Sequence, residues 1–143
     1  MLRGADDGFG KVTNGGGLQM KSALSEIRNA PVFEAAANKI LTHTDEYDVA
    51  ELILPAGEKG LFQRCAFIIA RMPMDFIAKH AVDLMEWFQD LNWPGAEEIF
   101  AALSRLPEDA LTAALNQSLE IARNAQDEEW AYNLHLKFDQ DAS

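Results

Sequence analysis

Apolar residues recur at helical spacing along most of the chain after residue 20, with polar residues between them. The clearest case is the segment 72–91. Its apolar residues are separated by steps of four, three, four and three: Ile77, Ala81, Leu84, Phe88 and Leu91. This spacing lays side chains along one stripe of an α-helix. Asp83, Glu86 and Asp90 would then lie on the opposite side, facing water.

The same spacing predicts further helices, separated by Gly- and Pro-containing breaks. The predicted helices are 21–29, 31–42, 44–54, 61–71, 72–91, 94–106, 107–123 and 127–138. Pro31 suits a first helical turn, where its missing N–H is not needed. The last helix is apolar on several sides and should be buried on more than one. No segment alternates long enough to predict a sheet. We therefore expect an all-α fold of about seven or eight short antiparallel helices, stacked as a HEAT-like or other alpha-solenoid repeat.

Residues 1–19 differ from the rest of the chain. They hold six of the nine glycines and have no helical periodicity, which predicts a flexible Gly-rich tail. The string "GGGLQM" is also what translation of a purine-rich ribosome-binding site, a spacer and a start codon would give. Met20 as the native start, with residues 1–19 as a translated leader, stays open beside an ordinary tail. Residues 20–143 are expected to form a single helical-repeat domain.

The net charge of −11 is concentrated in the C-terminal half. Residues 75–143 contain four Lys and Arg against fourteen Asp and Glu, a net charge of −10. Such a field repels phosphate backbones and favours basic partners. The alternative interpretation is a solvated acidic surface that serves solubility. No apolar run is long enough to span a bilayer, the N-terminus lacks a secretory signal, and Cys65 is the lone cysteine. These features predict a cytoplasmic protein without membrane or nucleic-acid partners.

Two of the three tryptophans lie close together in "EWFQDLNWPG". Pro94 is expected at the first position of a helix, because the residue before proline, Trp93, is driven out of the helical region. Asp90 and Asn92 could accept hydrogen bonds from exposed N–H groups there. Gly95 would let a neighbouring helix approach. We interpret this stretch as a buried corner between two helices, in preference to an exposed aromatic binding platform.

This corner resembles a bacterial all-helical family of unknown function that is similar to HEAT-type repeats. In that family a helix ends in Glu-Trp-Leu-Gln-Asp-Met-Asn-Trp-Pro, and an acidic helix with a Trp, here "DEEWAYNLHL", closes the domain. The residues that match the motif are Glu86, Trp87, Gln89, Asp90, Asn92, Trp93 and Pro94. The structural signature expected from this resemblance consists of Trp87, Asn92, Trp93, Pro94 and Trp130. Phe88 and Leu91 replace the usual Leu and Met. The resemblance covers about residues 45–138 and implies a fold without an activity.

No catalytic, metal or cofactor site is predicted. His80, Asp83 and Glu86 follow one another by one helical turn and could in principle bridge a divalent metal, but no second histidine is near in sequence. Cys65 lies among apolar residues and is expected to be a buried, inert thiol. The glycines at 15–17 do not belong to a phosphate-binding motif.

Three functional hypotheses remain. The first is a protein-interaction module that presents an acidic ridge to a basic protein, in the manner of an immunity protein or antitoxin. The ridge would consist of Asp83, Glu86, Asp90, Glu97 and Glu98. The alternative is an enzyme or nucleic-acid-processing protein with a site between helices near His80 and the Trp87/Trp93 corner. A third is self-association through an uncovered apolar face of the 127–138 helix. We expect a monomer or weak homodimer.

Overall fold

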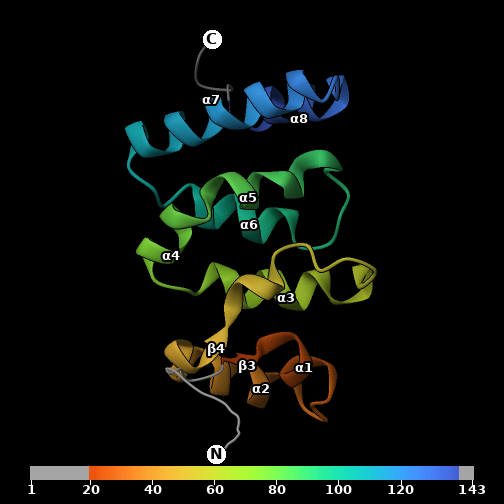
Figure 1. Ribbon diagram of the computed structural model, residues 1–143, viewed down its shortest axis with the longest axis vertical. Helices are drawn as coiled ribbons and strands as arrows, with labels where there is room; N and C mark the ends of the chain where they lie inside the picture. The colour runs from red at the N-terminus through yellow and green to blue at the C-terminus, as the bar shows by residue number, and fades with distance from the viewer. Residues whose placement is uncertain (1–19, 139–143) are drawn as a thin grey trace, which may run out of the picture.

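The helices lie in successive layers along one axis of the molecule (Figure 1). The computed structural model describes residues 20–138. Helices α1 and α2 form the layer at one end, α3 the next, α4, α5 and α6 the third, and α7 and α8 the layer at the other end. The prediction of an all-α fold of stacked short helices is confirmed. The predicted tail, residues 1–19, lies outside the described residues.

The described part of the chain contains eight α-helices, four short 3₁₀ helices (η) and two strands of two residues. In chain order they are β3 (Lys21–Ser22), α1 (Ala23–Arg28), α2 (Phe33–Thr42), η1 (Thr44–Glu46), β4 (Tyr47–Asp48), η2 (Val49–Leu52), η3 (Lys59–Leu61), α3 (Phe62–Ala70), α4 (Met74–Lys79), α5 (Ala81–Met85), η4 (Glu86–Gln89), α6 (Ala96–Leu103), α7 (Glu108–Asn124) and α8 (Glu128–Phe138). Within residues 20–138, none of these helices has the length and apolar character needed to cross a bilayer.

The two C-terminal helices follow directly from their sequences. Helix α7 has Glu108 and Asp109 in its first turn and Arg123 in its last, charges that oppose the helix dipole. Its buried residues recur at helical spacing along one stripe: Ala114, Leu115, Ser118, Leu119 and Ala122. The carboxylate of Asp127 accepts a hydrogen bond from the Trp130 N–H at 3.0 Å and so caps α8. The predicted start of this helix near Asp127 is confirmed.

The predicted helix at 44–54 is wrong. The segment forms two 3₁₀ turns with the short strand β4 between them, and β4 pairs in parallel with β3, placing Tyr47 opposite Lys21. Tyr47 and Val49 are buried and Asp48 between them is exposed, which is the two-residue period of a strand. The Glu51 carboxylate accepts hydrogen bonds from the Ser22 hydroxyl and the Leu24 N–H, at 2.8 and 3.2 Å. Contacts with residues 21–24 therefore override the local helix propensity of this segment.

The predicted helix at 72–91 is divided into α4, α5 and η4. The first break lies at His80, whose backbone angles are φ −107° and ψ 15°. Four of the five residues of the predicted apolar stripe are nevertheless buried in the core, Ile77, Ala81, Leu84 and Phe88, and the fifth, Leu91, is half-buried. The pattern thus identified the buried face and missed the kinks in the helix axis.

Three further expectations about helices are wrong. Helices α2 and α6 begin two residues after the prolines, at Phe33 and Ala96, so neither proline occupies the first helical position. Helix α8 is not buried on several sides, since Tyr132 is 64% exposed and Leu136 is 47% exposed. Its buried side is a single face that contains Trp130, Asn133 and Leu134.

Candidate functional site

The tryptophan corner is held together by a side-chain hydrogen bond and by aromatic packing. Trp87 is fully buried, and its indole N–H donates to the carbonyl oxygen of Pro94 at 2.9 Å. The ring of Phe62 on α3 packs edge-on against both Trp87 and Trp93, with centroid distances of 5.6 and 5.7 Å. Trp93 itself is half-buried. These contacts fasten the end of η4 to the start of α6 and to α3.

Gly95 allows this corner to close. Its φ is +92°, and a Cβ atom at this position would lie 2.5 Å from the Ala66 Cβ and 3.0 Å from the Phe62 carbonyl oxygen. The predicted close approach of a neighbouring helix is confirmed. Asp90 accepts a hydrogen bond from the Asn92 N–H at 2.9 Å, whereas α6 itself has no side-chain cap.

The five acids of the predicted ridge occupy different surroundings. Glu97 pairs with Lys137 of α8 at 2.7 Å, and Glu98 lies 3.7 Å from Arg71 at the end of α3. Asp90 lies in the turn of the corner, bound to the Asn92 N–H. Asp83 and Glu86 both face one hollow beside α5. The structure therefore divides the five acids. Asp83 and Glu86 line the hollow beside α5, whereas Glu97 and Glu98 line a separate one beside Trp93.

We call the hollow beside α5 the η2–α5 groove. It has a volume of about 310 Å³ and is lined by Ala50, Ile53, Leu54, His80, Asp83 and Glu86. One wall, from residues 50–54, is aliphatic, and the other, from residues 80–86, carries three ionisable side chains. The His80 Nδ1 atom is 3.8 Å from an Asp83 carboxylate oxygen, and the His80 ring packs against Phe76 at 4.5 Å between centroids.

The surroundings of Glu86 in this groove disfavour the charged form of its carboxyl group. Partial burial raises its pKa above the ordinary value, and the nearby charge of Asp83 raises it further. Within residues 20–138, neither Asp83 nor Glu86 has a Lys or Arg nitrogen within 4.0 Å. Nor do the described residues contain a group of three His, Cys, Asp or Glu side chains arranged to hold a metal ion. The groove is therefore an unneutralised anionic site beside an aliphatic wall.

The sequence reasoning found the anionic half of the groove and missed the aliphatic half. His80, Asp83 and Glu86 stood out because of their spacing along one helix. Ile53 and Leu54 belong to the predicted helix at 44–54, which does not form. Leu54 instead lies in the bend that follows η2 and has a positive φ of 44°. No short-range pattern signals that this turn lies against α5.

Cys65 is a poor candidate for a reactive thiol. It is completely buried in the core, and burial raises the pKa of its thiol to about 12, with a smaller effect from Glu58. A thiol with so high a pKa is almost entirely protonated at neutral pH and is a poor nucleophile. The expectation of a buried Cys65 is confirmed.

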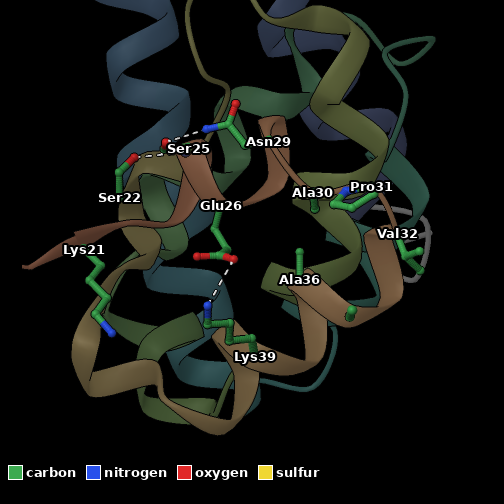
Figure 2. A pocket seen from close by; sticks show the side chains of 11 residues that line it. Lys21, Ser22, Ser25, Glu26, Asn29, Ala30, Pro31, Val32, Ala36 and Lys39 are labelled. Carbon is green, nitrogen blue, oxygen red and sulfur yellow. Dashed lines mark hydrogen bonds and ion pairs between the residues drawn. The ribbon is translucent and has the colours of Figure 1, made fainter.

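A larger hollow lies between α1 and α2, with a volume of about 690 Å³ (Figure 2). Its charged groups are already paired. Glu26 points across the hollow to Lys39 at 3.5 Å and accepts a hydrogen bond from the Tyr47 hydroxyl at 3.0 Å, while Lys21 binds Glu46 at 3.1 Å. Because these charges are satisfied within the protein, this hollow is a weaker candidate for ligand binding than the η2–α5 groove.

Comparison with known proteins places the chain in a family. The family described as a domain of unknown function (DUF5071) matches residues 63–143, which is more than half of the chain. The chain therefore belongs to this family, and the expectation of a family of unknown function is confirmed. The match includes the tryptophan corner and all five acids, whereas the aliphatic wall at residues 50–54 precedes it. No curated protein and no solved structure matches the chain.

Proposed function

We propose that this member of the DUF5071 family is a helical-repeat interaction module that binds a basic protein through its acidic C-terminal half. The observation that carries the proposal is that three of the four Lys and Arg side chains in residues 75–143 are already bound within the protein. Arg105 donates to the carbonyl oxygens of Ala70 and Met72, at 2.8 and 3.4 Å. Arg123 lies 3.8 Å from Glu120, and Lys137 pairs with Glu97. Most of the acidic surface is therefore left without a counter-charge.

Unneutralised acids are distributed over two adjacent layers of the stack. Asp83 on α5, Glu108 on α7, and Glu128 and Glu129 on α8 are exposed and have no Lys or Arg within 4.0 Å in the described part of the chain. A surface of one charge sign attracts a partner of opposite sign over long range and raises the association rate. The same field opposes binding to a phosphate backbone. An immunity-type or antitoxin-type role, covering a basic nuclease, is the most specific form of this proposal.

The test is capture of a partner from the source cell, followed by its purification and measurement of its affinity as a function of salt. The comparison is between the wild type and a variant with Asp83→Lys, Asp90→Lys and Glu129→Lys. We expect one basic protein whose Kd rises steeply with NaCl and rises at least about tenfold in the variant, because opposite charges steer and hold the complex.

A matched control reverses three exposed acids in the N-terminal half: Glu34→Lys, Asp45→Lys and Asp48→Lys. This variant has the same change in net charge and should bind the partner much more tightly than the C-terminal variant. Equal weakening in both variants would indicate a nonspecific charge effect. A partner whose affinity is insensitive to salt and to the C-terminal variant would contradict the proposal.

One observation favours the alternative of an enzyme or nucleic-acid-processing protein. A carboxyl group with a raised pKa beside a histidine in a groove, as for Glu86 and His80, is a common arrangement at catalytic sites. In that case His80→Ala would abolish an activity without altering the fold. In an interaction module, His80→Ala should change the affinity for the basic partner only slightly.

A further inference from the structure

We infer that the η2–α5 groove receives the side chain of a lysine from the basic partner. This inference rests on the proposed function and names the contact at its centre. The groove joins two segments about thirty residues apart in sequence, the turn at 50–54 and the helical segment at 80–86. Its two walls differ in chemistry in the same way as the two parts of a lysine side chain.

The charged wall fits an ammonium group. Asp83 and Glu86 lie one helical turn apart and face the same space, and no described Lys or Arg neutralises them. Glu86 is half-buried, so its charge is poorly solvated before a partner binds. The Asp83 side chain is 61% exposed at the rim of the groove, where an approaching cation meets it first. A bound ammonium would supply the missing counter-charge to both carboxylates.

The aliphatic wall fits the four-carbon stem. Ala50, Ile53 and Leu54 are not charged and cannot bind an ammonium, but they can pack against methylene groups. Lysine characteristically lays its stem along apolar surface while its charged head binds a polar site. Without this wall, Asp83 and Glu86 would be two acids on a helix surface. With it, the groove distinguishes a lysine side chain from a small inorganic cation.

Charge geometry favours lysine over arginine. The donors of an ammonium group point in three directions and can serve two separate carboxylates at once. A guanidinium presents a planar fork that matches the two oxygens of a single carboxylate. The anionic groups here belong to different turns of α5 and η4, and His80 lies next to Asp83. A compact ammonium is therefore the better match.

The experiment is an NMR titration of the isotope-labelled full chain with lysine blocked at both ends, Nα-acetyl-lysine N-methylamide. Blocked norleucine, with a similar stem and no charge, and blocked arginine are the comparison probes. We expect shifts confined to amides of 50–54 and 80–86 and to the Asp83 and Glu86 carboxylates. The double variant Asp83→Asn and Glu86→Gln should bind roughly tenfold more weakly, because two charge-assisted hydrogen bonds are lost. The double variant Glu34→Gln and Asp45→Asn, two exposed acids of the N-terminal half, is the matched control and should bind as the wild type does.

The outcomes separate this inference from the proposed function. Absence of shifts at the groove, or equal shifts with norleucine, would overturn the lysine site. Arginine bound more tightly than lysine would overturn the choice of side chain. Poly-lysine that binds the wild type and the double variant equally would overturn the groove and still support an acidic interaction module. Failure of poly-lysine to bind the wild type at low salt would overturn both.

Discussion

At the scale of single residues, the two tryptophans of the corner should differ in their contribution to stability. Trp87 is fully buried and hydrogen-bonded to the Pro94 carbonyl oxygen, so Trp87→Ala should cost about 3–5 kcal/mol of unfolding free energy. Trp93 is half-buried, and Trp93→Ala should cost roughly half as much, about 1.5–3 kcal/mol. Urea unfolding of both variants measures the difference. Equal costs would mean that the Trp93 ring is as deeply packed as that of Trp87.

Comparison of alanine substitutions at Gly57 and Gly95 should separate the cost of a left-handed backbone from the cost of a steric contact. Gly57→Ala introduces a side chain at φ +75° with no atom within 4 Å of the new Cβ, so only the left-handed conformation should cost energy, about 1–2 kcal/mol. Gly95→Ala adds a contact of 2.5 Å with Ala66, which should cost about 1–3 kcal/mol more. Chemical denaturation of the two variants checks the order. A cost for Gly95→Ala no greater than for Gly57→Ala would show that α3 moves away freely.

The carboxyl group of Glu86 should make stability depend on pH. Its pKa in the folded state is raised by desolvation and by Asp83, so the folded protein binds more protons than the unfolded chain just above the ordinary value of 4.5. Stability is then lost as pH rises through this window. We expect Glu86→Gln to be more stable than the wild type at neutral pH, with the difference vanishing at acidic pH well below 4.5. Thermal unfolding at both pH values tests this. A stability loss in Glu86→Gln at neutral pH would mean that the charged form is favourably bound.

At the scale of elements, the sequence predicts those segments whose buried residues recur at regular spacing within the segment itself. Helix α7 buries a single stripe of residues at helical spacing, and this spacing alone predicts the helix. The segment 44–54 was mispredicted because Tyr47 pairs with Lys21 and Glu51 binds Ser22, contacts that span 26 and 29 positions. The η2–α5 groove is unpredictable for the same reason. It requires the turn at 50–54 to lie against the segment at 80–86, and no periodicity within either segment encodes that approach.

Helix α8 illustrates an element fixed by polar contacts with a distant segment. The buried Asn133 amide donates to the carbonyl oxygens of Phe88 and Gln89, at 2.9 and 3.4 Å, and the Trp130 indole donates to the Met85 carbonyl oxygen at 3.1 Å. Asn133→Ala should cost about 1–3 kcal/mol, because buried carbonyl groups lose their donor. Hydrogen exchange should accelerate in α8 more than in α7, while the exposed Asn116→Ala serves as control. Equal acceleration in both helices would mean that they unfold only together.

At the scale of the whole molecule, the charge of the C-terminal half should act on folding and on binding in opposite directions as salt is added. The described residues 75–138 hold twelve Asp and Glu against four Lys and Arg, and these excess negative charges repel one another across the two acidic layers. Salt that screens them should therefore raise the melting temperature. Screening is effective when the Debye length falls to about 10 Å, near 0.1 M NaCl. The Glu97–Lys137 pair resists screening better than a fully exposed pair, because the lysine side chain is only 17% exposed.

Calorimetry across a series of NaCl concentrations should thus show rising stability, while affinity for a basic partner falls over the same range. A variant with Glu108, Glu128 and Glu129 changed to Gln should show a flatter dependence in both measurements. Stability that falls with salt would mean that attractive ion pairs outweigh the repulsion, and the acidic surface would then serve the fold instead of a partner.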